Sequence, residues 1–321
     1  MNVNPASDHL LRLLQITWPI IQAPMAGIST PSMAAAVSNA GGLGSLGVGA
    51  MTASAAAASA AAFRELSRAS LNVNVFCHRP PTENAPAEAD WLQRLRPEFE
   101  KVGSEPPASI SDIHKSFVED DLMLATIIAA RPRAVSFHFG LPPEAAIRAL
   151  REAGIILLGT ATSHPEARIL EKSGVHAVVA QGYEPGGHQG VFDPDAADDQ
   201  LGTLPLTRLL VRNLGVPVIA AGGIMDGAGI ASVLHLGAAA AQLGTAFLAT
   251  DESAADEGYR RALLSDAANH TMMTRHLRPP GVLSGKPVHG LRHTGGPNRY
   301  SALPDCLRGR QGPACGGKSD R

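Results

Sequence analysis

Short apolar segments alternate with helical segments along most of this chain, and this alternation is the feature that most restricts its fold. Eight segments have the length and the nearly continuous apolar character of strands buried on both faces. Strands of this kind, separated by helices, predict a parallel sheet covered by helices. The predicted strands are Pro19–Ala26, Leu43–Val48, Leu71–Phe76, Ala134–Phe139, Ile155–Ala161, His176–Gly182, Pro217–Gly222 and Ala239–Ala246.

Helical segments follow most of these strands. Eight strand–helix units within about 230 residues are what a (β/α)8 barrel needs. A doubly wound sheet is the alternative, but it usually has fewer strands, and no GxGxxG motif follows the first strand. We therefore expect an α/β protein with the TIM-barrel fold. The clearest predicted helices are Ser32–Ala40, Ala53–Ser67, Pro143–Ala153, Pro165–Lys172, Leu206–Asn213 and Ala228–Leu236.

Two segments interrupt the alternation. The first is an insertion at residues 77–118, with a helical piece near Glu88–Lys101. The second follows the last strand and is helical in composition over Asp251–His276. Long segments after barrel strands are typical of lids and substrate walls. We expect the barrel in residues 1–250, a small helical lid in residues 251–292 and an irregular tail in residues 293–321.

Composition and charge exclude several classes of protein. Lys and Arg number 27 against 29 Asp and Glu, a net charge of −2, so no basic excess points to nucleic acid. The alanine-rich run at residues 53–63 is too short to span a bilayer, and residues 1–12 lack the apolar core of a signal peptide. The cysteines Cys77, Cys306 and Cys315 are too scattered for a disulfide framework, which fits a reducing compartment. We expect a cytoplasmic protein, without a metal because its histidines have no acidic or cysteine partners at ligand spacing.

Function in a barrel is carried by the carboxyl ends of the strands and the loops that follow them. The polar residues Asn74, His138, Gln181 and Gln242 fall there, on the strand faces that we predict to point inward. Each alone could be a hydrogen-bonded core residue, but four on one rim favour a ligand site. On the fourth strand the bulky residues that alternate with His138 are predicted to face outward, namely Val135, Phe137 and Phe139.

Glycine-rich turns follow the last three strands. In the loop QGYEPGGHQG, His188 stands between glycines, which makes it a candidate general base or anion partner rather than a packed residue. A flexible glycine loop with an incidental histidine is the alternative. Gly222–Gly223 and Gly244–Thr245 fit the phosphate site that barrels commonly form after their last two strands. A phosphate site alone leaves open whether the ligand is a flavin mononucleotide or a sugar phosphate.

Together these motifs resemble those of the nitronate monooxygenase family, formerly called 2-nitropropane dioxygenases. The resemblance covers about Pro19 to Thr250. Related enoyl-reductase and quinone-reductase branches share the GGH loop but tend to have QGGM where this chain has QAPMAG. The motifs are PIIQAPMAGISTPSMAAAVSNAGGLGSLG (Pro19–Gly47), VNVF (Val73–Phe76), SFHFGLP (Ser136–Pro142), QGYEPGGHQG (Gln181–Gly190), AAGGI (Ala220–Ile224) and QLGTAFL (Gln242–Leu248).

The resemblance implies an FMN-containing barrel that oxidises alkyl nitronates, such as propionate 3-nitronate, with O2 to a carbonyl compound and nitrite. It places the active-site histidine on His188 and a second pocket histidine on His138. A homodimer is compatible with the sequence. The implied FMN contacts are Met25, Asn74, Gln181, Gly186, Gly222, Gly223, Gln242, Leu243, Gly244 and Thr245.

Some residues depart from the family pattern, and other functions stay open. Pro185 stands where alanine is usual and Gln189 where a basic residue is common; beyond Gly290 the match is poor, with Tyr300 the one candidate for a pocket-closing aromatic residue. The first alternative is an NAD(P)H-dependent reductase of quinones or enoyl thioesters on the same FMN barrel. The others are a phosphate-binding lyase or isomerase without flavin, and a ligand-binding regulator without turnover.

Overall fold

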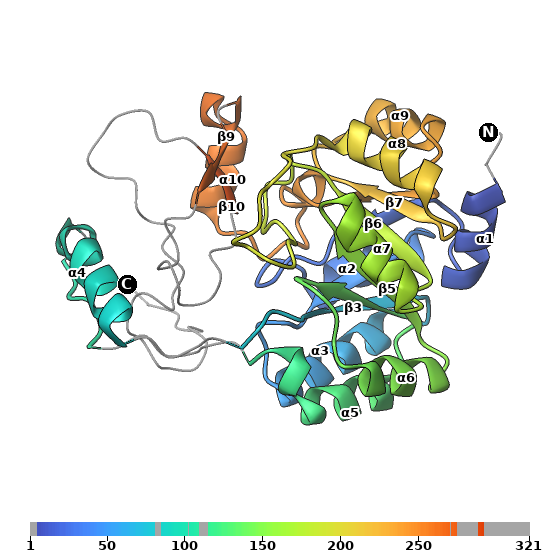
Figure 1. Ribbon diagram of the computed structural model, residues 1–321, viewed down its shortest axis with the longest axis horizontal. Coiled ribbons are helices and arrows are strands. Elements are labelled where there is room, and N and C mark those ends of the chain that lie inside the picture. The colour runs from blue at the N-terminus through green and yellow to red at the C-terminus, as the bar shows by residue number, and fades with distance from the viewer. Residues whose placement is uncertain are drawn as a thin grey trace, which may run out of the picture.

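Eight parallel strands form the sheet of this protein in the computed structural model, which describes residues 5–80, 85–101, 103–108, 115–269, 271–274 and 288–291. Their order is β1-β8-β7-β6-β5-β4-β3-β2, and a bridge between Ile21 and Leu43 joins β2 to β1. The sheet is therefore a (β/α)8 barrel, and the predicted fold is confirmed (Figure 1). The strands are β1 (Ile20–Gln22), β2 (Gly44–Gly47), β3 (Leu71–Phe76), β4 (Ala134–His138), β5 (Ile156–Ala161), β6 (Ala177–Gln181), β7 (Val218–Ala221) and β8 (Ala240–Leu243).

Helices between the strands flank the barrel (Figure 1). Several begin at a side chain that accepts a backbone N–H of the first turn, as Thr30, Thr52, Ser163 and Asp226 do. Such caps satisfy amides that have no partner within the helix. The helices are α2 (Pro31–Asn39), α3 (Ala53–Leu66), α5 (Asp121–Ala130), α6 (Glu144–Glu152), α7 (His164–Lys172), α8 (Thr203–Asn213) and α9 (Gly227–His235). All six predicted helices are present, whereas α5 was not predicted.

A further helix that the sequence analysis did not predict, α1 (Pro5–Leu14), lies below the barrel interior. Leu10 and Leu14 are both 0% exposed and pack with interior side chains of the strands. The hydroxyl of Ser7 donates to the carbonyl of Ala239, just before β8, over 2.6 Å. Because Ala239 precedes its strand, α1 covers the amino-terminal end of the barrel and leaves the carboxyl end for function.

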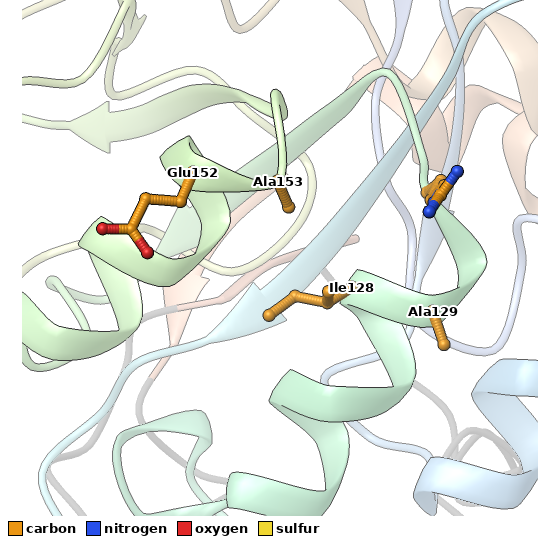
Figure 2. Close-up of a pocket in the computed structure, with 5 residues that line it drawn as sticks. Ile128, Ala129, Glu152 and Ala153 are labelled. Atoms are coloured by element: carbon orange, nitrogen blue, oxygen red, sulfur yellow. The ribbon is translucent and has the colours of Figure 1, made fainter.

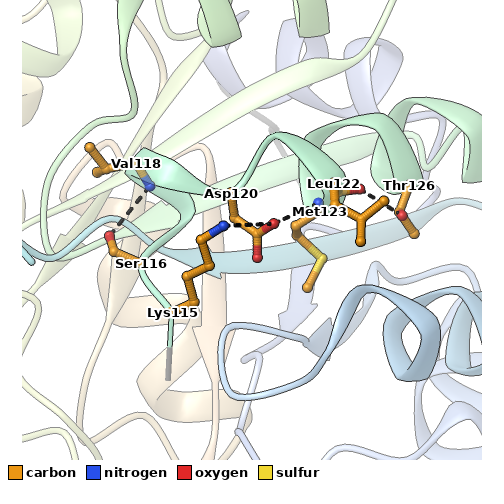
Figure 3. Close-up of polar contacts among 7 residues, drawn as sticks. All are labelled: Lys115, Ser116, Val118, Asp120, Leu122, Met123 and Thr126. Carbon is orange, nitrogen blue, oxygen red and sulfur yellow. Dashed lines mark hydrogen bonds and ion pairs between the residues drawn. The ribbon is translucent and has the colours of Figure 1, made fainter. Parts of the chain in front are cut away.

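The insertion after β3 contains α4 (Ala85–Lys101) and η1 (Phe117–Glu119) and returns to the barrel at α5. Ser116 accepts the N–H of Val118 over 3.3 Å, and Asp120 accepts the N–H of Met123 over 3.0 Å. The ammonium of Lys115 lies 3.8 Å from the carboxylate of Asp120 (Figure 3). These contacts fix where the insertion ends and α5 begins.

The chain after β8 contains η2 (Thr245–Phe247), α10 (Glu257–Leu263), η3 (Asp266–Asn269) and an antiparallel pair, β9 (Thr271–Thr274) with β10 (Val288–Leu291). The sequence analysis expected helical structure here and did not predict the strand pair. The guanidinium of Arg260 donates to three backbone carbonyls of residues 249–255 and so holds this segment together. The lid role of this region stays a prediction, and residues 293–321, with Tyr300, lie outside the described residues.

Two strands, β1 and β8, end three or more residues earlier than predicted. β1 ends at Gln22 because the backbone turns there, with the hydroxyl of Ser29 accepting the N–H of Met25 over 2.9 Å. β8 ends at Leu243 because the 3-10 helix η2 begins two residues later. None of the helices in the described ranges is long and apolar enough to cross a membrane.

Candidate functional site

Polar side chains from four strands meet at the carboxyl end of the barrel. Asn74, His138, Gln181 and Gln242 share their strand faces with residues that pack in the barrel interior, such as Ala134 on β4, Val179 on β6 and Ala240 on β8. The structure therefore places these four side chains on the rim as strand alternation predicted. Their roles in ligand binding stay predictions.

A layer of small polar side chains lies just beneath this rim. The hydroxyl of Ser136 accepts hydrogen bonds from the side-chain amides of Asn72 and Asn74, each over 3.0 Å. Asn72 also donates to Ser45 on β2 over 3.1 Å. These side chains are buried, so the bonds hold Asn74 in one place at the rim. Sequence reasoning placed Ser136 on the strand face of His138 but did not select it as a site residue.

The loop after β6 is held to the barrel by the side chain of Gln181. Its Nε2 donates to the backbone carbonyl of His188 over 3.0 Å, and its Oε1 accepts the N–H of Gly190 over 2.6 Å. Nε2 of His138 lies 3.2 Å from the same carbonyl of His188. Because a carbonyl only accepts, this contact requires a proton on Nε2 of His138. Gln181, which the resemblance assigned to FMN, thus positions the loop that carries His188.

Four rings gather where this loop meets β3 and β4. The ring centroid of Phe139 lies 4.2 Å from that of His138 and 6.0 Å from that of His188, and it meets both edge-on. Phe76 lies 5.1 Å from Phe139 and 6.5 Å from His188. The two candidate histidines therefore share one aromatic wall at the mouth of the barrel.

The prediction that Phe139 faces outward is wrong. β4 ends at His138, and Phe139 has a φ of 70°, in the left-handed region, which breaks the alternation of the strand. Its ring turns toward the histidines, while Val135 and Phe137 remain in the outer core as predicted. A bulky residue in this conformation costs about 1–3 kcal/mol, and such strain is concentrated at functional sites.

Gly190 allows the loop to lie directly against β4 and β5. A Cβ at Gly190 would lie 2.7 Å from Cε1 of His138 and 2.9 Å from Cγ2 of Thr160. Thr160 stands on the inward face of β5 after Ile156 and Leu158, both interior residues. Sequence reasoning missed Thr160, although the alternation that located His138 could have found it.

Two glycine turns lie next to each other after the paired strands β7 and β8. Gly222 and Gly223 have φ values of 117° and 65°, which favour glycine. Within the described part of the chain, the backbone amides of Gly222, Gly223, Gly244 and Thr245 have no hydrogen-bond acceptor. The helix α9 starts shortly after the first turn and directs its positive end there. Unpaired amides beside a helix N-terminus are the donors that a phosphate group needs.

The loop after β6 and the turn after β1 both reach these glycines. A Cβ at Gly186 would lie 3.2 Å from Oγ1 of Thr245. A Cβ at Gly244 would lie 3.8 Å from the sulfur of Met25. Residues assigned to FMN after β1, β6 and β8 are thus brought together on one rim.

A surface hollow lies elsewhere, between the ends of α5 and α6. Its lining includes Ile128, Arg131 and Glu152 (Figure 2). Because these helix ends precede β4 and β5, the hollow lies toward the amino-terminal side of the barrel, away from the histidines. Among the residues that the structure describes, no group of three or more His, Cys, Asp or Glu side chains could hold a metal ion.

An eight-stranded α/β barrel with two imidazoles at the carboxyl ends of its strands has the layout of the barrel enzymes. The family model described as nitronate monooxygenase matches residues 7–293. The chain belongs to the nitronate monooxygenase family. Membership implies a flavin cofactor and a small-molecule substrate.

Similar proteins support this assignment. A nitronate monooxygenase of Paraburkholderia phytofirmans is 60% identical over 265 residues, which are 83% of this chain and 72% of the relative. A nitronate monooxygenase of Pseudomonas aeruginosa is 49% identical over 293 residues, 91% of this chain and 80% of the relative. Among solved structures, the nitroalkane oxidase of Streptomyces ansochromogenes is 40% identical with a TM-score of 0.77, covering 88% of this chain and 78% of that one. FabK of Thermotoga maritima is 30% identical with a TM-score of 0.67, covering 88% and 74%.

Proposed function

We propose that this chain oxidises alkyl nitronates, such as propionate 3-nitronate, with O2 and an FMN cofactor. The carbon–nitrogen bond of the nitronate breaks, a carbonyl compound forms, nitrite leaves, and O2 is the oxidant. The observation that carries the proposal is that the two imidazoles His138 and His188 share one rim with the glycine turns whose amides are unpaired. A flavin mononucleotide has a ring that would lie beside the two imidazoles and a phosphate that would lie at the glycine turns.

The residues fit FMN at its phosphate end. The amides of Gly222, Gly223, Gly244 and Thr245 would hold the phosphate, because the described residues offer them no other acceptor. Met25, Asn74, Gly186, Gln242 and Leu243 would line the rest of the cofactor. When bound, the flavin supplies the redox chemistry; the protein binds, orients and sets the local charge.

His188 is the residue that we assign to the substrate. A nitronate is an anion, so a protonated imidazole at the end of the β6 loop would hold it by a charge-assisted hydrogen bond. In its neutral form the same imidazole would remove the α-proton of a neutral nitroalkane. His138 already contacts the backbone of His188 through Nε2, so it would fix the position of that loop beside the substrate.

The first test is the purified full chain, which should carry the absorption spectrum of an oxidised flavin and release nitrite from propionate 3-nitronate in air. His188→Asn should still bind FMN but release nitrite at least about tenfold more slowly, because a hydrogen bond to a charged group contributes about 1.5–3 kcal/mol. Full activity of His188→Asn on both the nitronate and the nitroalkane would remove His188 from this scheme.

The same preparation tests the reductase alternative. Anaerobic mixing with NADH should leave the flavin oxidised if nitronate is the reducing substrate. Rapid bleaching by NADH, with no nitrite from nitronates, would favour the reductase. A colourless chain that takes up no FMN would contradict both.

A further inference from the structure

The first residue of α8, Thr203, is bonded to the glycine turn after β7. Its Oγ1 lies 2.9 Å from the carbonyl oxygen of Gly222 and 3.2 Å from that of Ala221. Thr203 is buried, with 3% of its surface exposed. The hydroxyl thus links the start of a helix to the turn whose amides would face the phosphate.

Glu184, from the β6 loop, binds the same residue. Both oxygens of its carboxylate accept the N–H of Thr203, over 2.9 and 2.8 Å, and Oε2 lies 2.9 Å from the hydroxyl. The residue that precedes α8 is Gly202, which has no side chain to cap the helix. Glu184 therefore caps α8 from another loop, and the helix dipole stabilises its charge there.

Three glycines allow Thr203, Glu184 and the turn after β7 to lie close together. A Cβ at Gly182 would overlap Thr203, and a Cβ at Gly222 would lie 2.7 Å from Oγ1 of Thr203. A Cβ at Gly202 would lie 2.8 Å from Oε1 of Glu184. Because a Cβ at Gly182 or Gly222 would clash with Thr203, the β7 turn packs directly against Thr203 and, through it, against Glu184.

We propose that Thr203 and Glu184 are positioning residues that hold the Gly222–Gly223 turn for the terminal phosphate of the flavin and so set the preference of this barrel for FMN over riboflavin. The inference rests on the proposed FMN site. FMN and riboflavin share the ring and the ribityl chain, so the ratio of their dissociation constants reports the phosphate alone.

Whether the preference for FMN rises or falls in Glu184→Gln separates a positioning role of Glu184 from a purely electrostatic one. The carboxylate of Glu184 lies beside the turn, with its Cβ 3.2 Å from where a Cβ at Gly223 would be. A negative charge there repels a phosphate, so charge alone predicts that Glu184→Gln raises the preference for FMN. A positioning role predicts that the preference falls.

The test is flavin binding to the full chain after removal of bound flavin, measured by quenching of flavin fluorescence with FMN and with riboflavin. Thr203→Val and Glu184→Gln should each lower the ratio of the riboflavin Kd to the FMN Kd by about five- to tenfold, the effect of about one hydrogen bond. Thr203→Ser keeps the hydroxyl and should restore most of the ratio.

Glu166→Gln is the matched control. The carboxylate of Glu166 accepts the N–H of Thr162 over 2.7 Å and the N–H of Phe192 over 2.8 Å, so it also binds a loop amide but away from the glycine turns. Its substitution should leave the FMN-to-riboflavin ratio unchanged.

An unchanged or raised ratio in both Thr203→Val and Glu184→Gln would overturn the inference while FMN binding itself stands. If Glu184→Gln does not fold, as judged by circular dichroism, the comparison of Thr203→Val with Thr203→Ser decides alone. A wild-type chain that binds neither flavin, or both equally, would contradict the proposed cofactor site and this inference together.

Discussion

The side chain of Gln181 holds His188 by its backbone and not by its imidazole, through a hydrogen bond of 3.0 Å from Nε2 to the carbonyl oxygen. The main chain that carries the imidazole is consequently bonded to a rigid strand. A side chain held in this way is placed by the scaffold although it stands on a loop, which suits the role proposed for His188.

Gln181→Leu should lower both stability and activity. The change keeps the size of the side chain but leaves the buried N–H of Gly190 and the carbonyl of His188 without this partner, a cost of about 1–3 kcal/mol. We expect nitrite release to fall about tenfold or more as the loop loses its fixed position. Steady-state kinetics on FMN-loaded protein and thermal unfolding measure the two effects.

Gln189→Leu is the comparison for that prediction. Gln189 is also buried and lies in the loop that Gln181 holds, but its Oε1 has no partner among the described residues and the hydrogen bond of its side chain to Asp198 is long at 3.3 Å. Its substitution should therefore change stability much less. Equal losses in both variants would show that burial of an amide, rather than the bonds of Gln181, is what matters.

Gly190→Ala should destabilise the protein while Gly187→Ala should not. The new methyl group at Gly190 would lie 2.7 Å from the His138 ring, and such overpacking costs about 1–3 kcal/mol. A Cβ at Gly187 meets nothing within 4 Å. Urea unfolding of the two variants measures the difference, and equal stabilities would contradict the close approach of the loop to β4.

Leu14→Ala should cost about 2–5 kcal/mol in the free energy of unfolding, because it opens a cavity under the barrel interior. Leu14 is 0% exposed, whereas Leu122 on α5 is 69% exposed, so Leu122→Ala should stay within about 0.5 kcal/mol of wild type. Chemical denaturation of both checks this. A small effect at Leu14 would mean that α1 does not contribute to the core.

Stability should fall in mild acid because of His176. Its Nδ1 accepts the N–H of Leu157 over 2.9 Å, and burial, with Arg151 and Arg133 nearby, lowers the pKa of His176 below its ordinary value of 6.5. The unfolded chain therefore takes up this proton at higher pH than the folded chain does. The stabilisation is complete above pH 6.5 and is lost as the pH falls toward the lowered pKa.

Unfolding free energies at about pH 7.5 and about pH 5.5 test this, with His176→Asn as the variant that cannot titrate. Wild type should lose more stability between the two values than the variant loses. The other histidines contribute to both proteins, so they cancel in the comparison. Equal losses would show that His176 does not contribute to the acid sensitivity.

The barrel could be predicted from sequence because its strands are buried on both faces and are therefore apolar almost without interruption. Strand ends were less accurate, since Ala23–Ala26 is as apolar as β1 while its backbone turns around Ser29. The helix α1 was not predicted, because its leucines are buried only by interior side chains of strands that are distant in the sequence.

At the site, strand alternation located the side chains but not their partners. Strand alternation placed Gln181 on the inner face correctly. The bonds of Gln181 to His188 and Gly190 depend on the path of a loop, and loops lack the regular alternation of residues that strands have. Ser136, Thr160 and Thr203 were not selected as site residues because small hydroxyl residues are common everywhere, and only contacts reveal their role. The sequence does not signal a left-handed conformation at a phenylalanine such as Phe139.

At position 139 the backbone and the side-chain surroundings favour different residue types. Its backbone, with a φ of 70°, suits glycine or asparagine, while the surrounding histidines and Phe76 suit an aromatic ring. A smaller residue would relax the main chain but leave the imidazoles less confined. A β-branched residue would suit neither the positive φ nor the aromatic surroundings. The chain thus accepts a strained backbone at this point, and the Phe139 ring lies against both imidazoles as a result.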